Sequence, residues 1–224
     1  MIQFDPIKHV YTNVLTGETY ISVSTLVSKF KSDFDKAAIS RAVADKRGIS
    51  QAEVLASWEQ INTESKVIGT SIHAAIEEFC KTGTIQPAHQ KAIAEFKKLG
   101  SFSKASGALL EQLVYSHMHK IAGTADIIYP DGKFFDVYDI KTNKKFNFFS
   151  AYRKNLKPPV DHFSDCEFNS YGLQLSLYAY LYHIMTGRIA RHLSIFYWDK
   201  IAETFTRYPI AYLKNDVENI IDTL

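Results

Sequence analysis

Apolar and polar positions along this chain follow two different periods, which predict a mixture of strands and helices. Segments in which every second residue is apolar or β-branched are typical of strands, and several such segments are bounded by turn residues. Asp131-Gly132 lies between two of them and predicts a tight hairpin turn. The expected strands are residues 4–11, 19–23, 109–115, 121–129, 134–142 and 193–198.

Longer segments with apolar residues three or four apart predict helices. Ser24 is a candidate N-cap for a first helix, and glycines stand where several later helices should end. Residues 35–56 are helical in composition, with breaks expected near Gly48 and Ser50. The remaining expected helices are residues 61–81, 87–99, 173–185 and 210–224.

The order of these elements indicates the fold class. An N-terminal hairpin and a helical region precede a three-stranded meander, which is followed by a helix, a strand and a closing helix. We therefore expect an α/β fold with a central mixed β-sheet flanked by helices. The length of 224 residues fits one domain, 1–224, with residues 1–65 as the hairpin and helical region and 66–224 as the core.

Composition narrows the function classes. The net charge of +2 excludes a general polycation, so any nucleic-acid site must be a local basic patch. No apolar run is long enough to span a membrane, and no secretory signal is visible, so we expect a cytoplasmic protein. The only cysteines, Cys80 and Cys166, are too few for a zinc or iron–sulfur centre.

The segment Val137-Tyr138-Asp139-Ile140-Lys141 carries the most informative chemistry. Side chains two apart in a strand point to the same face, so Asp139 and Lys141 should project together, whereas Asp136 should face away. Asp126, in the preceding strand, supplies a second carboxylate. Two carboxylates and an amine that converge are costly to hold unless a cation lies between them.

Two helices carry further polar pairs. His73 and Glu77 are four residues apart and share a helix face, as do Gln174 and Tyr178. Each pair taken alone also fits an ordinary amphipathic helix with its polar side chains at the boundary of the core. Glu111, on the strand before Asp126, is either a supporting carboxylate of the same site or a simple exposed position.

These four motifs occur in the order seen in a known family. A helix histidine, Gly123-x-x-Asp126, Asp139-x-Lys141 and Gln174-x-x-x-Tyr178 together resemble the RecB-like branch of the PD-(D/E)XK nuclease superfamily. The N-terminal hairpin and the helix after Gly69 resemble mitochondrial genome maintenance exonucleases and related phage exonucleases. The resemblance covers roughly residues 20–205 and implies a restriction-endonuclease-like core. It also implies an arch formed by the helices near residues 33–64.

The resemblance implies a role for each residue. Mg²⁺ or Mn²⁺ would be held by His73, Asp126, Asp139 and the main-chain carbonyl of Ile140, with Glu77 as a further candidate through water. Lys141 would orient or deprotonate the attacking water. Gln174 and Tyr178 would position the scissile strand or the lysine. The cysteine cluster of some members is missing, so no iron–sulfur cluster is implied.

A basic and aromatic segment follows the catalytic strand. Lysines neutralise phosphates and aromatic rings stack on bases, which suits a single strand or a frayed end. The alternative is a long loop with a hydrophobic anchor and a solvated charged face. The predicted DNA-binding residues are Ser24, Lys144, Lys145, Phe146, Tyr152, Arg153 and Lys154.

We therefore expect a metal-dependent DNA exonuclease that prefers single-stranded ends, in DNA replication, recombination or repair, in bacteria or phage-infected cells. One alternative is a double-strand exonuclease or a structure-specific endonuclease of phage recombination. Another is a DNA-binding module that keeps the fold without cleaving. DNA with a free end is the expected partner, no membrane partner is expected, and a homo-oligomer stays open.

Overall fold

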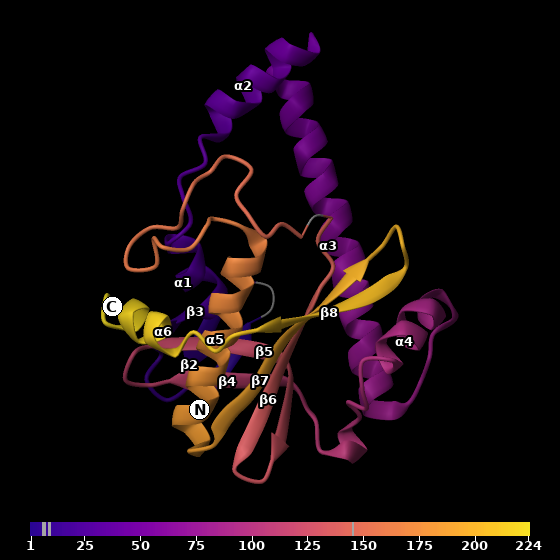
Figure 1. The fold of residues 1–224 in the computed structure, drawn as a ribbon, viewed down its shortest axis with the longest axis vertical. Helices are drawn as coiled ribbons and strands as arrows, with labels where there is room; N and C mark the ends of the chain where they lie inside the picture. Colours follow the sequence, from indigo (N-terminus) through magenta and orange to yellow (C-terminus); the bar gives the residue numbers. More distant parts are fainter. Residues whose placement is uncertain (6–7, 9, 145) are drawn as a thin grey trace.

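The expected α/β fold is confirmed in the computed structural model, which describes residues 1–5, 8, 10–144 and 146–224. One mixed sheet of eight strands is covered by helices on both faces (Figure 1). The strands are β1 (Ile2–Asp5), β2 (Val10–Asn13), β3 (Thr19–Ser22), β4 (Leu109–Ser116), β5 (Ile121–Asp131), β6 (Phe134–Lys141), β7 (Ile189–Asp199) and β8 (Thr204–Ile210). The helices are α1 (Val23–Lys29), α2 (Lys36–Arg47), α3 (Gln51–Thr82), α4 (Gln90–Lys97), α5 (Glu167–Thr186) and α6 (Lys214–Ile221), with 3₁₀ turns η1 (Pro87–His89) and η2 (Lys104–Ser106).

The strand order is β1-β2-β3-β5-β6-β7-β8, and β4 pairs with β5 as well. Neighbouring strands are antiparallel except for β3 beside β5 and β6 beside β7, which are parallel. A parallel neighbour needs a crossover, and α5 supplies it between β6 and β7. The helix therefore lies across the strands that carry the predicted site.

Alternation along β6 builds a core on each face of the sheet. Phe135 and Val137 point toward α1, α5 and α6, where they join Leu173 in the larger core. Tyr138 and Ile140 point the other way, into a second core beneath α4 and the C-terminal half of α3. The two cores hold the sheet rigidly, because β6 has almost no solvent contact between Phe135 and Ile140.

The sheet divides between β5 and β6. Their ladder ends at the pair Ile127–Tyr138. Beyond it, β6 continues beside β7 as far as Lys141, whereas β5 runs back beside β4 to Ile121. Main-chain groups that face the gap lose their ladder partners there. Side chains on both strands can therefore enter the gap, and the predicted site residues Asp126 and Asp139 lie at this point.

Local details differ from the sequence predictions in several places. The N-cap of α1 is Ser22, whose Oγ accepts a hydrogen bond from the N–H of Thr25, and not the expected Ser24. Helix α5 begins at Glu167 and not at the expected residue 173. The predicted strand over 4–11 is two strands, β1 and β2. The helix expected from residue 61 begins at Gln51, behind a capping box formed by Ser50 and Glu53, and is one continuous helix of 32 residues. Strand β8 was not predicted, and the last helix begins at Lys214.

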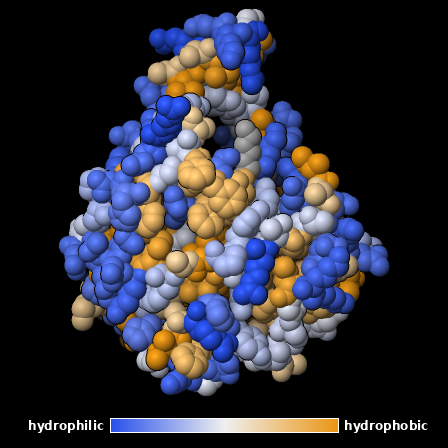
Figure 2. All heavy atoms as spheres, in the orientation of Figure 1, coloured by the Kyte–Doolittle hydropathy of each residue, from blue (hydrophilic) through white to orange (hydrophobic). Residues whose placement is uncertain are grey.

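Helix α2 and the N-terminal half of α3 project from the body as a helical arm (Figure 1). With 32 residues, α3 is about 48 Å long, so it extends well past the sheet. Gly48 in the left-handed conformation ends α2 and turns the chain into α3. Ala44 and Val54 are the buried hydrophobic residues that hold the two helices together. The space-filling view is hollowed below this arm (Figure 2).

Candidate active site

Three carboxylates form a row across neighbouring strands at the division of the sheet. The pairs Leu110–Ile127 and Gln112–Ala125 place Glu111 opposite Asp126 in the β4–β5 register. Continuing the β5–β6 register by one step beyond its last pair places Asp126 opposite Asp139. Residues directly opposite in antiparallel strands share a face, so all three carboxylates are directed to the face covered by α5.

His73 joins this row from α3. Its Nδ1 atom lies 3.5 Å from Asp126 Oδ2. Ligand atoms of His73, Glu111 and Asp126 all lie within 4.8 Å of one another, a spacing that could hold one metal ion. Gly69, one turn earlier, makes this approach feasible, because a Cβ there would lie only 2.7 Å from Thr142 Oγ1 at the end of β6. The glycine lets α3 come close to the strand that carries the site.

Asp126 also closes the divided sheet. Its Oδ2 accepts a hydrogen bond of 2.6 Å from the main-chain N–H of Ile140, which has lost its ladder partner on β5. The carboxylate therefore takes the place of a strand neighbour. The structure thus gives the main chain of Ile140 a defined role, whereas its predicted carbonyl contact with a metal stays a prediction.

Asp139 is buried and Lys141 is its nearest charge. Lys141 Nζ lies 2.6 Å from Asp139 Oδ2, so the two form an ion pair. This buried Oδ2 atom nevertheless accepts no hydrogen bond of suitable geometry from any of the described residues. Burial raises the pKa of Asp139 to about 6, and the charge of Asp126 adds to the rise while Lys141 opposes it.

Glu111 has the strongest sign of crowded negative charge. Burial of its carboxyl, followed by repulsion from Asp126, Glu77 and Asp139, raises the pKa of Glu111 to about 8. By surface area the residue is exposed, so water partly screens the repulsion from these charges. Its φ of +46° is unusual for a non-glycine residue in a strand. Such strain is held only where the surroundings enforce it.

Lys141 is held as a cation. Burial lowers the pKa of Lys141, but the charges of Asp139 and Asp126 outweigh it, and the net pKa is raised. Its Nζ also lies 4.6 Å from the centroid of the Tyr171 ring on α5, within cation–π range. The amine is therefore fixed between the carboxylates and an aromatic face.

Helix α5 contributes the predicted pair. Gln174 Nε2 donates a hydrogen bond of 2.8 Å to the hydroxyl of Tyr178, which is buried. Tyr178 packs on Gly123, where a Cβ would lie 2.6 Å from Tyr178 Cε1 and 3.0 Å from Val23 Cγ2. The glycine of Gly123-x-x-Asp126 is thus required by close packing of α5 on β5.

Two further acidic residues, Asp136 and Glu77, lie outside the cluster of His73, Glu111 and Asp126. Asp136 faces away from the site, as predicted, and is neutralised by Arg191, whose Nε and Nη2 donate hydrogen bonds of 3.0 and 2.9 Å. Glu77 forms an ion pair with Lys81 on α3. It lies close enough to Glu111 to raise the pKa of that group but is not part of the three-residue ligand cluster.

The predicted DNA-binding residues fall into three groups. Ser24 lines a pocket of about 450 Å³ together with Glu111, Gln174 and Tyr178. Phe146 is packed among aromatic rings, with Tyr208 stacked at 4.6 Å, and anchors its loop to the larger core. Lys145 lies outside the described residues. The others are exposed along the loop after β6, and they are Lys144, Tyr152, Arg153 and Lys154.

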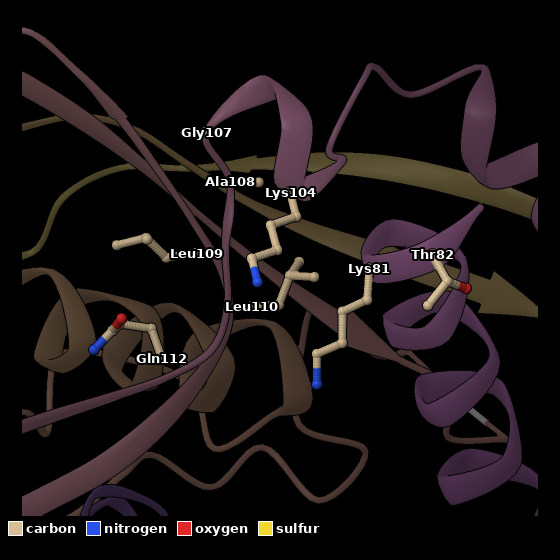
Figure 3. Close-up of a pocket in the computed structure, with 8 residues that line it drawn as sticks. All are labelled: Lys81, Thr82, Lys104, Gly107, Ala108, Leu109, Leu110 and Gln112. Atoms are coloured by element: carbon tan, nitrogen blue, oxygen red, sulfur yellow. The ribbon is translucent and has the colours of Figure 1, made fainter. Parts of the chain in front are cut away.

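A second recess adjoins the site at the end of α3. It has a volume of about 660 Å³, and Lys81 and Lys104 extend into it from opposite sides over Leu110 (Figure 3). Lys81 lies close enough to Glu111 for its charge to oppose the rise in the pKa of that carboxyl, so this basic recess borders the row of carboxylates.

The donor set fits a divalent cation. Carboxylate oxygens and one imidazole nitrogen are ligands that Mg²⁺ and Mn²⁺ accept. Burial, and then repulsion between the carboxylates, raises the pKa of Asp139 and of Glu111, and a bound cation would offset both effects. Oδ2 of Asp139 is a buried atom that pairs with the Lys141 amine but accepts no hydrogen bond of suitable geometry from the described residues. The sequence alone does not decide whether Glu111 supports the site or is simply exposed. The β4–β5 register, which places Glu111 opposite Asp126, assigns it to the site.

No protein-family model and no curated protein matches this chain. Among solved structures it is similar to SSO0001, with 16% identity over 90% of this chain and 71% of that chain and a TM-score of 0.45. It is also similar to a putative exonuclease from Eubacterium rectale, with 12% identity over 91% of this chain and 77% of that chain and a TM-score of 0.42. None of the helices in the described part of the chain has the length and apolar composition needed to cross a membrane.

Proposed function

We infer that this protein is a metal-dependent DNA exonuclease that hydrolyses phosphodiester bonds at the ends of single-stranded DNA. The observation that carries this proposal is the row of Glu111, Asp126 and Asp139 on three neighbouring strands, with His73 beside it and Lys141 at its end. A binding module has no need to hold three carboxylates where their charges repel one another.

Each residue has a task in this proposal. His73, Glu111, Asp126 and Asp139 would hold Mg²⁺ or Mn²⁺, which when bound supplies Lewis-acid stabilisation of charge on the phosphate and a more acidic water. Neutral Lys141 would take a proton from the attacking water and, once charged, would lie beside the scissile phosphate. The water oxygen forms the new bond to phosphorus, the bond to the leaving oxygen breaks, and that oxygen takes a proton from solvent.

The environment of Lys141 links its proton to the charge of its neighbours. Asp139 and Asp126 raise its pKa against the opposing effect of burial. When a cation neutralises these carboxylates, burial remains and the pKa of Lys141 falls. The amine then becomes able to accept a proton from the attacking water, which is the behaviour expected of a general base.

The test is a cleavage time course in Mn²⁺ with end-labelled linear single strands, linear duplexes and closed single-stranded circles. We expect progressive shortening of the linear single strands and intact circles. Lys141→Ala and Asp139→Asn should each lower the rate by about 100-fold or more. Cleavage of circles would assign an endonuclease. Full activity in both variants would mean that the chemistry lies elsewhere, and no cleavage by the wild type in Mg²⁺ or Mn²⁺ would overturn the proposal.

A further inference from the structure

A recess of about 470 Å³ lies between the chain that leads into the arm and the loop after β6. Three aromatic side chains line it, and we call it the aromatic cleft: Phe34 from the α1–α2 connection, and Phe149 and Tyr152 from the loop. They are 60%, 80% and 71% exposed, respectively, which is high for rings of this size. Phe149 and Tyr152 make no ring contact with another aromatic side chain of the described residues.

The walls of the aromatic cleft are held in place. Asp165 Oδ2 accepts hydrogen bonds from the main-chain N–H and the hydroxyl of Ser32, at 2.8 and 2.5 Å, which ties the loop to the α1–α2 connection. The Ser150 hydroxyl accepts hydrogen bonds from the N–H groups of Tyr152 and Lys154, both at 3.3 Å. The rings are therefore presented by a structured loop, which reduces the entropy lost when a ligand binds.

Two cations at the aromatic cleft are available to an anionic ligand. Of the acidic residues that line the cleft, Asp33 forms an ion pair with Lys157 at 2.6 Å, whereas Asp165 and Glu167 accept hydrogen bonds from uncharged groups, Ser32 and the N–H of Asn147 respectively. By contrast, Lys31 in the cleft wall and Arg153 beside Tyr152 form no ion pair within the described residues. Cations beside exposed aromatic rings suit a nucleic acid strand, because the cations contact its phosphates and the rings stack on its bases.

Helix α5 connects this cleft to the candidate active site. Glu167 lines the cleft and is the first residue of α5. Tyr171, one turn or about 6 Å further along the helix, carries the Lys141 amine on its ring, and Gln174 follows in the next turn. A nucleic acid strand that lies along α5 would therefore reach both the aromatic cleft and the candidate active site.

From these contacts we propose that the aromatic cleft is a subsite for an unpaired nucleobase of the substrate strand, which stacks on Phe149 and Tyr152 while Lys31 and Arg153 hold the adjacent phosphates. The proposal rests on the function inferred above and adds the reason for a single-strand preference. Bases within a duplex stack on one another and cannot offer a face to the rings unless they are unstacked. The cleft thus selects an unpaired segment.

The first test measures affinity without cleavage. Fluorescence anisotropy in chelator compares wild type, Phe149→Ala and Tyr152→Ala on a single-stranded oligonucleotide and on the same strand with abasic sites. Each substitution should weaken binding of the normal strand roughly 5- to 150-fold and leave binding of the abasic strand unchanged. Tyr152→Phe should retain wild-type affinity, and Ile201→Ala, at a residue 86% exposed outside the cleft, is the matched control.

Charge is tested separately. Lys31→Ala should reduce the slope of log affinity against log salt by about 0.7, the contribution of one phosphate contact in a single strand. Equal losses on normal and abasic strands, or no loss in either alanine variant, would overturn the subsite. The exonuclease proposal can fail while the subsite proposal holds. If the wild type binds normal strands more tightly than abasic strands but never cleaves DNA, the subsite is supported and the exonuclease is rejected.

Discussion

Glu111 in the candidate site should be largely protonated near neutral pH unless a cation binds, whereas Asp139 should be mostly ionised at pH 7. The pKa of Glu111 is raised to about 8 and that of Asp139 to about 6. A metal ion must displace the bound protons, so we expect Mn²⁺ affinity to increase with pH up to about 8. Titration calorimetry in buffers of different ionisation enthalpy should show release of nearly one proton per ion at pH 7. Glu111→Gln should remove most of that release.

The raised pKa of Glu111 also determines how the stability of the folded protein changes with pH. An unfolded glutamate loses its proton near pH 4.5, but folded Glu111 keeps it to about pH 8, so between these values the unfolded state binds fewer protons. In chelator, the midpoint of thermal unfolding should therefore fall as the pH rises from about 5 to 8, and less so in Glu111→Gln. Glu78→Gln, on the same helix as His73, should behave as wild type. An identical pH profile in Glu111→Gln would contradict the shift.

Strand parity explains which site residues the sequence could locate. Alternation along one strand suffices to put Asp139 and Lys141 on one face and Asp136 on the other, because no long-range information is needed. Glu111 could not be placed this way. Its position depends on the register between β4 and β5, and its positive φ breaks the ordinary strand conformation. Pairing between strands is set by the whole sheet, which a local pattern does not encode.

The contact between α5 and β5 depends on one glycine. A Cβ at residue 123 would lie 2.6 Å from Tyr178 Cε1, so the helix and the strand would have to separate. We expect Gly123→Ala to lower the free energy of unfolding by about 1–3 kcal/mol. It should also reduce cleavage, because Tyr178 and its partner Gln174 move away from Asp126. Urea unfolding and cleavage rates measure the two effects.

Gly172→Ala on the same helix is the matched control. A Cβ there would meet Ile210 Cγ2 at 3.5 Å and Leu213 Cδ1 at 3.7 Å, both ordinary van der Waals contacts. Because alanine favours a helix interior over glycine, this variant should gain up to about 1 kcal/mol. If the two variants had similar stabilities, close packing at Gly123 would not be the reason for its presence.

Elements were predictable where a local signal marks their ends. Gly48 and Ser50 locate the break between α2 and α3, since the first ends α2 in the left-handed conformation and the second caps α3. Strand β8 carries no such signal. Residues 204–210 are only partly buried and pair with β7 as the last strand of the order, so their sequence lacks the apolar alternation of an inner strand.

At the scale of the whole molecule, the two cores lie on the sheet and the arm lies outside both. The β5–β6–β7 region is closed on both faces, whereas Ala44 and Val54 are the buried hydrophobic residues between α2 and α3. Local opening costs least where few apolar contacts are broken. The arm should therefore open while the sheet stays folded. Such opening would let a DNA strand reach the aromatic cleft and the hollow below the arm.

Because the arm packs separately from the two cores, a substitution in the arm should destabilise the arm and leave the sheet unaffected. Val54→Ala should lower the free energy of arm opening by about 2 kcal/mol, through lost burial and a small cavity. Hydrogen exchange of residues 36–64 should then speed up roughly 10- to 30-fold, while exchange in β6 and β7 stays unchanged. Ile61→Ala, at an exposed position of the same helix, should have little effect.

A single-stranded oligonucleotide in chelator should slow exchange in the arm of both wild type and Val54→Ala, since only a closed arm completes the wall beside Phe34. The variant should need more DNA for the same protection, because part of the binding energy closes the arm. Equal acceleration in the arm and in β6 would mean that the molecule unfolds as one unit. In that case the arm could not admit a DNA strand by local opening, and the substrate would have to enter the hollow below the arm while the arm stays closed.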